Sequence, residues 1–213
     1  MKRNQKLSLC VAVAFLVSFV LWTIAVCNVD VMPIGPKGTS VGLANLNSFV
    51  HNLTGVHFSL YILTDWLGLV PVAFAVGFAI LGLVQWVARK KLKYVDRNLF
   101  VLGGFYLVTI AAYIFFEYVV INYRPVLIEG SLEASYPSST TLLVLCVMPT
   151  ALLQLKDRIQ YKVLRSIVCV IITAFVAFMV VGRLLSGVHW LSDIVGGTLL
   201  STGLVALYRS LTL

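Results

Sequence analysis

Long apolar runs separated by short polar stretches make up most of this 213-residue chain. Six of them are at or near the length of about 20 residues that an α-helix needs to cross a bilayer, and they contain few or no charged residues. They predict membrane-spanning helices at about 7–27, 66–88, 99–121, 138–155, 166–185 and 190–208. No stretch between the runs is long enough for a separate soluble domain, so we expect one all-α integral membrane domain over residues 1–213.

The segment over residues 41–64, between the first two predicted spans, has a different pattern. A mainly apolar stripe recurs at helical spacing and consists of Leu43, Leu46, Val50, Leu53, His57 and Leu60. The asparagine and threonine residues of the segment lie off this stripe. A helix with one apolar and one polar face lies in the membrane interface. We therefore expect an amphipathic helix over 41–64 at the outer surface of the bundle.

Lysine and arginine residues lie mainly in stretches that six spans would place on one side of the membrane. Thirteen of the sixteen are there: Lys2, Arg3, Lys6, Arg89, Lys90, Lys91, Lys93, Arg97, Lys156, Arg158, Lys162, Arg165 and Arg209. Because short loops rich in these residues stay in the cytoplasm, this side and both termini are predicted to be cytoplasmic. The net charge of +8 arises in loops beside spans, so we expect no nucleic-acid binding.

The composition agrees with a membrane protein. The chain is 60% hydrophobic and 11% charged, with a mean hydropathy of +0.99, which excludes an ordinary soluble protein. The first run has the basic start of a signal peptide, but it is longer than usual and lacks an A-x-A cleavage site, so we expect a retained span. The four cysteines match neither a metal site nor a disulfide framework. We expect a protein of the plasma membrane.

Candidate chemistry is concentrated in the segment 182–193, which carries Arg183, His189 and Asp193. A charged residue at bilayer depth costs about 2.5–3.5 kcal/mol, so such residues tend to be functional. If the chain is helical from Val188, His189 and Asp193 lie one turn apart, and the carboxylate orients the imidazole. Arg183 offers a planar set of donors for phosphate or carboxylate oxygens. The segment predicts an anion that is held by arginine and attacked by histidine.

Two further polar pieces fall on the same predicted outer side. One is Arg124-Pro125, and the other is Pro137-Ser138-Ser139-Thr140 at the start of the fourth span. Proline is preferred at the first helical position, so the backbone N–H groups of the next three residues are expected to be unpaired. Unpaired N–H groups and the helix dipole make an anion site. Ser138, Ser139 and Thr140 are therefore predicted to bind phosphate with the two arginines.

These pieces, in this order, resemble the motifs of the type 2 phosphatidic acid phosphatase family: Lys-six residues-Arg-Pro, Pro-Ser-Gly-His, and Ser-Arg-five residues-His-three residues-Asp. The resemblance covers about the last half of the chain. It implies that His189 is the nucleophile that takes the phosphoryl group and that Asp193 orients it. Arg124, Arg183 and Ser138 would bind phosphate. The family fold is a helical bundle, commonly six-spanning, and its chemistry uses no metal or other cofactor.

The sequence departs from these motifs at two functional positions. Glu117 stands where the family has lysine, and Thr140 stands where it has the histidine that protonates the leaving group. Loss of a general acid typically costs 10²–10⁴-fold in rate. His57 and a protonated Glu117 are candidates for a substitute acid, although Glu117 is equally compatible with an ion pair to either arginine. Ser139 for glycine and Gly182 for serine are milder changes.

Three functions are compatible with this pattern. The leading hypothesis is a phosphatase that removes phosphate from a lipid phosphate or diphosphate at the non-cytoplasmic face, through a phosphohistidine at His189. The second is a degenerate family member that binds or transports phosphorylated lipids without hydrolysing them, which the departures at Glu117 and Thr140 motivate. The third is an unrelated six-span transporter, against which the ordered occurrence of three motifs argues. Phosphatidate, phosphatidylglycerol phosphate and polyprenyl diphosphate present the same group to these residues, so the lipid stays open.

Overall fold

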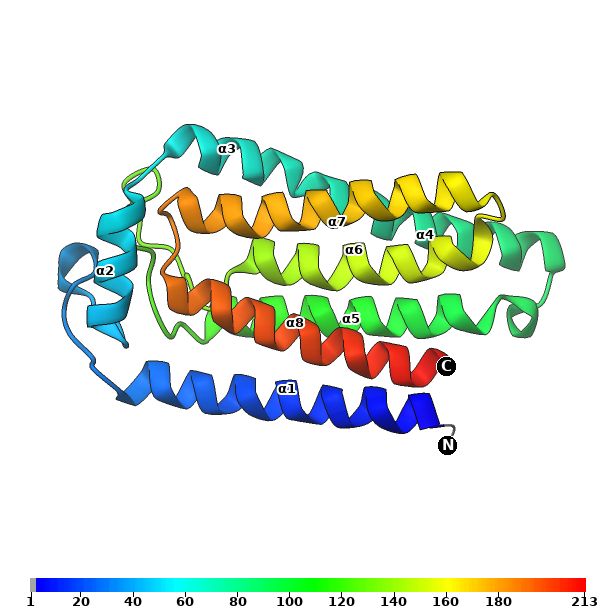
Figure 1. The fold of residues 1–213 in the computed structure, drawn as a ribbon, viewed down its shortest axis with the longest axis horizontal. Coiled ribbons are helices and arrows are strands. Elements are labelled where there is room, and N and C mark those ends of the chain that lie inside the picture. The colour runs from blue at the N-terminus through cyan, green and yellow to red at the C-terminus, as the bar shows by residue number, and fades with distance from the viewer. Residues whose placement is uncertain (1–2) are drawn as a thin grey trace.

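The computed structural model describes residues 3–213, which form a bundle of long helices (Figure 1). Over these residues there is no strand beyond isolated bridges. Two short 3₁₀ turns, Pro36–Gly38 and Leu92–Tyr94, lie in connections. The α-helices are α1 (Arg3–Asn28), α2 (Ala44–Thr54), α3 (Phe58–Leu67), α4 (Leu69–Arg89), α5 (Arg97–Tyr118), α6 (Ser139–Arg158), α7 (Lys162–Leu185) and α8 (Leu191–Thr212).

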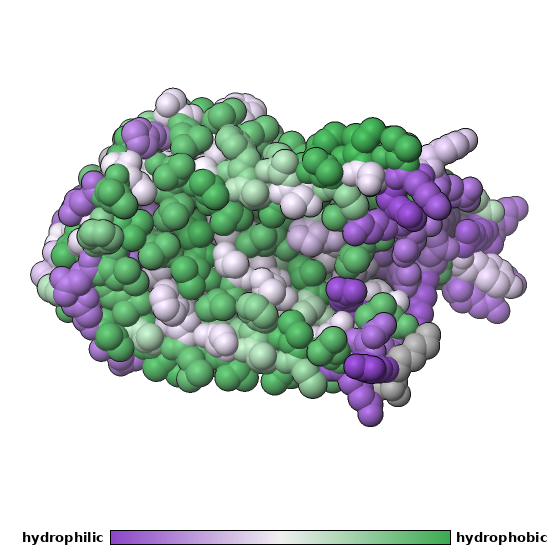
Figure 2. Space-filling model, in the orientation of Figure 1, coloured by the Kyte–Doolittle hydropathy of each residue, from purple (hydrophilic) through white to green (hydrophobic). Residues whose placement is uncertain are grey.

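The described residues contain six candidate membrane spans, as predicted. Five of them are single helices. The second span along the chain is formed by α3 and α4 together, over Phe58–Arg89. On the face shown in Figure 2, apolar side chains cover the length of the bundle, whereas polar ones gather at its two ends. Large apolar side chains of the spans, such as Leu83, Val87 and Val170, are exposed. A surface of this kind is stable against lipid and not against water, so the chain is an integral membrane protein.

The amphipathic segment differs from the prediction, because the helix expected over 41–64 is divided. Its first part is α2, which lies across one end of the bundle (Figure 1). The helix stops at Gly55, whose φ of 69° and ψ of −164° are not helical. The chain then enters α3, so residues 58–64 belong to the second span and not to the surface helix. The apolar stripe of the sequence continues across this break in the backbone.

The two ends of the bundle differ in content. Both termini and the α4–α5 and α6–α7 connections lie at one end, and α2 lies at the other, which we call the α2 end (Figure 1). The predicted cytoplasmic basic residues in these connections therefore share the end with the termini; Lys2 lies outside the described residues. Which end faces the cytoplasm stays a prediction. Helix α6 lies centrally and contacts α4, α5, α7 and α8, while α1 packs along α8.

The loop between α5 and α6 is fixed to the core at Tyr136. This side chain is 1% exposed, and its ring packs on Phe19 and Phe116. Its hydroxyl is 2.7 Å from that of Thr23 in α1. The ring also lies so close to Gly196 in α8 that a Cβ there would come within 2.6 Å of it. The loop consequently has a fixed position at the α2 end, directly before α6.

Two turns meet at the α2 end and hold α3 against α7. The backbone N–H of His57 donates to the carbonyl of Ser186 over 2.9 Å. Gly187 has a φ of +68°, and a Cβ on it would lie 2.0 Å from the carbonyl oxygen of Gly55. This contact requires a residue without a side chain, and it sets the position of the segment that leads to His189.

We expect Gly187→Ala to destabilise the protein more than Gly130→Ala. Gly130 also has a positive φ, of +78°, but a Cβ added to it would have no atom of the described residues within 4 Å. Both substitutions carry the penalty of about 1–2 kcal/mol for a left-handed alanine, and only Gly187→Ala adds the clash. The thermal unfolding midpoint in detergent measures the difference. Equal midpoints for the two variants would contradict the close packing of the turns.

Candidate active site

His189 and Asp193 lie at the start of α8 but are not directly hydrogen-bonded to each other. The helix begins at Leu191, so the condition of a helix from Val188 is not met, and His189 Nδ1 is 3.7 Å from Asp193 Oδ2. A hydroxyl lies between them instead. Ser135 Oγ is 3.0 Å from His189 Nδ1 and donates a short hydrogen bond to Asp193 Oδ2. The expected orientation of the histidine by the carboxylate is therefore indirect in this structure.

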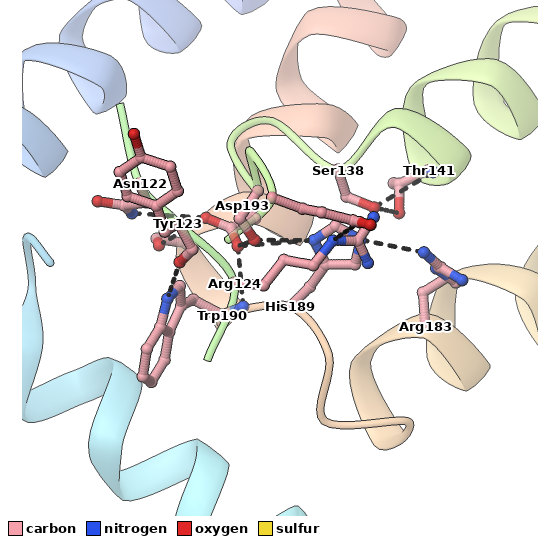
Figure 3. A network of polar contacts seen from close by, with 12 residues as sticks. Asn122, Tyr123, Arg124, Ser138, Thr141, Arg183, His189, Trp190 and Asp193 are labelled. Atoms are coloured by element: carbon pink, nitrogen blue, oxygen red, sulfur yellow. Dashed lines mark hydrogen bonds and ion pairs between the residues drawn. The ribbon is translucent and has the colours of Figure 1, made fainter. Parts of the chain in front are cut away.

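Arg124 and Arg183 converge on the other ring nitrogen of His189 (Figure 3). An Nη of Arg183 is 3.1 Å from Nε2, and an Nη of Arg124 is 3.5 Å from it. Arg183 is 1% exposed and Arg124 is 9% exposed. Because arginine only donates hydrogen bonds, Nε2 is the acceptor and carries the lone pair. The nucleophile expected at this position thus faces two cationic groups.

Each of the two arginines forms an ion pair with a carboxylate, and neither carboxylate is that of Glu117. Glu133 Oε2 is 3.0 Å from Arg124 Nε, but the angle between the two groups does not allow a hydrogen bond. The Nε–H group of Arg124 therefore has no hydrogen-bonding partner among the described residues. Asp65 Oδ1 is 3.6 Å from an Nη of Arg183, whose Nε is also unpaired there. Both carboxylates are partly exposed, so water screens them. Two buried N–H donors consequently lack a hydrogen-bond acceptor among the described residues.

Helix α3 contributes a face to this cluster that the sequence motifs do not include. The Tyr61 ring lies 5.1 Å from the guanidinium carbon of Arg183 and 5.8 Å from that of Arg124. One helical turn further on, Thr64 Oγ1 accepts a hydrogen bond of 3.4 Å from Arg183. These contacts, with Asp65, hold Arg183 from the side opposite His189. No periodicity in the sequence distinguishes these residues from the rest of the second span.

The carboxylate of Asp193 is fixed by several donors. The Trp190 N–H is 2.9 Å from Oδ2, and the Asn122 amide and Ser192 hydroxyl are 3.5 and 3.3 Å from Oδ1. Ser192 is itself bonded through its N–H and hydroxyl to the buried side chain of Asn47 in α2. A carboxylate with this many donors acts as an acceptor only.

Burial lowers the pKa of His189 well below its usual value, and the adjacent positive charges of Arg124 and Arg183 lower it further. The imidazole is therefore neutral at neutral pH and its Nε2 is unprotonated, as a nucleophile requires.

The same shift makes stability depend on pH. In the unfolded chain this histidine titrates with a pKa near 6.5, so below that pH the unfolded state binds a proton that the folded state does not. We expect the thermal midpoint to fall as the pH decreases from about 6.5 toward 5, and His189→Asn to reduce this slope. Midpoints measured in detergent at a series of pH values test it, with His57→Asn as control. Parallel curves for the parent and His189→Asn would contradict the shift.

The predicted anion site at the start of α6 is arranged differently from the expectation. Pro137 precedes the helix, and Ser138 is its N-cap, whose Oγ accepts from Thr141 N and Oγ1 over 3.5 and 3.0 Å. The backbone N–H of Ser138 donates to the carbonyl of Asp193 over 3.1 Å and is not unpaired. Ser139 and Thr140 are the first helical residues. They line a cavity of about 300 Å³ between α4, α5 and α6 that also reaches Asp65.

Neither accessory candidate is hydrogen-bonded or ion-paired to His189, Arg124 or Arg183 within the described residues. His57 is exposed, and its Nε2 lies 2.9 Å from the carbonyl of Thr54. Glu117 is exposed on α5 and lines a small cavity with Ser135 and Ser139. Within residues 3–213, no group of three or more His, Cys, Asp or Glu side chains is placed to hold a metal ion.

Ser135 is the residue at the centre of the site that the sequence interpretation missed. It lies two residues before Pro137, next to a motif that was recognised, and it is 2% exposed. A polar residue in a loop carries no signal of burial. Only its position directly before the motif could have drawn attention to it.

Comparison with known proteins supports the motif assignment. No curated protein matches the chain. Among solved structures, the fold is similar to the crystal structure described as the first transmembrane PAP2 type phosphatidylglycerolphosphate phosphatase from Bacillus subtilis. The TM-score is 0.56 with 19% identity, over 95% of this chain and 96% of that one. The family model described as the PAP2 superfamily matches residues 105–212. The match covers about half of the chain and contains all three motifs, which confirms the resemblance: this protein belongs to the PAP2 superfamily.

Proposed function

We propose that this protein is a phosphatase that removes phosphate from a lipid phosphate or diphosphate through a covalent intermediate on His189. The observation that carries the proposal is the convergence of two buried guanidinium groups on the lone pair of His189 Nε2. Their two Nε–H groups have no hydrogen-bonding partner within residues 3–213. Buried donors without partners are costly, and a phosphate with several acceptor oxygens satisfies them. Membership of the PAP2 superfamily supports phosphatase chemistry.

The residues suit a two-step transfer. Nε2 attacks phosphorus, the P–O bond to the lipid breaks, and the lipid oxygen leaves with the electron pair. Water then attacks the phosphohistidine, inorganic phosphate is released, and the lone pair returns to Nε2. The two arginines stabilise the negative charge of the transferring group in both steps. Splitting one difficult displacement into two is the advantage of a covalent intermediate.

The nature of the leaving group decides which substrates react quickly. Among the described residues, the lining of the cavity that contains Thr140 includes no histidine to protonate a departing alkoxide. A lipid diphosphate releases a lipid phosphate, which leaves without a proton, whereas a lipid monophosphate releases an alkoxide. We therefore propose that diphosphates are hydrolysed faster. The neighbour of similar fold is described as a phosphatidylglycerolphosphate phosphatase, so lipid monophosphates belong in the comparison.

The site lies at the α2 end of the spans, and we propose that this level is that of the lipid headgroups. Basic residues are concentrated at the opposite end, which supports a site on the non-cytoplasmic face. A lipid whose phosphate reaches this level keeps its chains in the bilayer while the phosphate contacts the arginines. We propose a substrate that is drawn from the outer leaflet.

Phosphate release by the purified protein in detergent micelles tests the proposal. Phosphatidate, phosphatidylglycerol phosphate and a polyprenyl diphosphate are compared in the presence of EDTA, with dephosphorylated lipid as blank. The expected result is release from at least one lipid, fastest from the diphosphate, with an acid-labile phosphoprotein after rapid quenching. Binding of these lipids with no release from any of them would overturn the proposal in favour of a lipid-binding function.

A further inference from the structure

Ser135 lies between His189 and Asp193, the two residues that the third sequence motif places together. Its hydroxyl oxygen is 3.0 Å from His189 Nδ1 and donates to Asp193 Oδ2, whereas the two motif residues are 3.7 Å apart. The serine is almost fully buried. Its N–H donates to the carbonyl of Asn122 over 2.9 Å, and the next residue, Tyr136, is fixed in the core. The hydroxyl is therefore held in place by the backbone on both sides.

The hydrogen-bonding capacities of these groups determine where each proton lies. A serine hydroxyl has one hydrogen to donate, and here it goes to Asp193, which is only an acceptor. Its oxygen can then only accept from His189, so Nδ1 must carry a hydrogen. The other side of the ring leads to the same tautomer independently, because the two arginines donate toward Nε2.

We propose that Ser135 is a positioning residue that holds the Nδ1 hydrogen of His189 and links it to Asp193. The expected effect of Ser135 on the rate rests on the proposed function, whereas its expected effect on the hydrogen bonding of His189 does not. The hydroxyl keeps the Nδ1 hydrogen in place and directs the Nε2 lone pair at the bound phosphate. When Nε2 forms its bond to phosphorus, the ring becomes positively charged. The carboxylate then stabilises that charge through the hydroxyl, and no proton passes to Asp193.

The tautomer can be measured without any turnover. In protein labelled with ¹⁵N-histidine, the chemical shifts distinguish protonated from unprotonated ring nitrogens, and His189→Asn identifies the His189 signals. At neutral pH the parent is expected to show Nδ1 protonated and Nε2 unprotonated. In Ser135→Ala the arginines still donate to Nε2, so the tautomer is expected to stay the same, but the Nδ1 resonance is expected to shift because its hydrogen-bond acceptor is lost. An Nε2-protonated parent, or an Nδ1 resonance that Ser135→Ala leaves unchanged, would overturn the proposal whatever the activity of the protein.

Kinetics separate positioning from a general structural effect. Ser135→Ala is expected to lower kcat about 10- to 100-fold with little change in KM, because the arginines that bind phosphate are untouched. If the serine acts through Asp193, the effects of Ser135→Ala and Asp193→Asn must be non-additive in the double variant. Additive effects, or a loss confined to KM, would overturn the kinetic role.

Ser131→Ala is the matched control, since this serine lies in the same loop but is exposed. It is expected to leave kcat, KM and the Nδ1 resonance unchanged. Ser135→Cys keeps the volume of the side chain with a weaker hydrogen-bonding group, and it is expected to fall between the parent and Ser135→Ala. Thermal midpoints of all variants show whether the fold is retained. Failure of the proposed function would appear as an inactive parent with the expected tautomer, which differs from failure of the role of Ser135.

Discussion

Replacement of His189 by alanine is expected to abolish phosphate release, with a loss of at least about 10⁴-fold in kcat. His189 Nε2 lies within 3.5 Å of a guanidinium nitrogen of both Arg124 and Arg183, and alanine leaves nothing at this position to accept the phosphoryl group. Phosphate binding is expected to survive, because the guanidinium groups remain. Release of phosphate and labelling of the protein by a ³²P-lipid are the two measurements, and both signals should disappear together.

The matched control for this change is His57→Ala. This histidine lies at the same end of the bundle, but it is exposed and bonded to the carbonyl of Thr54. Its replacement is expected to change kcat by less than about twofold, within the usual range of a surface substitution. A phosphoprotein that persists in His189→Ala, or a loss in His57→Ala as large as in His189→Ala, would show that the nucleophile lies elsewhere.

Arg183→Lys is expected to lower kcat/KM by about 10²–10³-fold, although the charge is kept. The guanidinium group is buried between His189 on one side and Thr64 and Asp65 on the other, and its planar donors reach several acceptors at once. Lysine provides a point charge at a different distance and cannot reproduce this arrangement. The effect should appear in both binding and rate, because in the proposed reaction this group contacts the phosphate throughout the transfer.

Arg209→Lys provides the comparison for Arg183→Lys. Arg209 is exposed and lies in the last turn of α8, at the end opposite the site. Its replacement should leave kcat/KM unchanged, and thermal midpoints of both variants should show that the fold is kept. Activity of Arg183→Lys within about threefold of the parent would mean that this arginine has only a structural role.

The parts of this protein that depend on local pattern could be predicted from sequence. The six spans follow from the length and composition of apolar runs, and the motif around His189 follows from the spacing of charged residues in an apolar context. The division of the helix at Gly55 was missed because the apolar stripe continues across the break. A periodic pattern reports which face is apolar, and it does not report whether the backbone is continuous.

The parts that depend on how loops fold back could not be predicted in the same way. Ser135 enters the site because Tyr136 is fixed in the core, and Asn47 reaches Ser192 because α2 lies across the bundle end. Both are contacts between segments far apart in sequence. Glu117 was a candidate partner for an arginine, but Glu133 and Asp65 take that place.

The face of α3 against Arg183 limits how this protein can be recombined with its relatives. The family model begins at residue 105, after Tyr61, Thr64 and Asp65. A chimera that joins residues 105–212 to the first helices of another protein would keep the proposed nucleophile and both arginines. It would lose the contacts of Tyr61, Thr64 and Asp65 with the buried guanidinium of Arg183. We therefore expect an exchange of segments to keep activity only where α3 is exchanged together with α7.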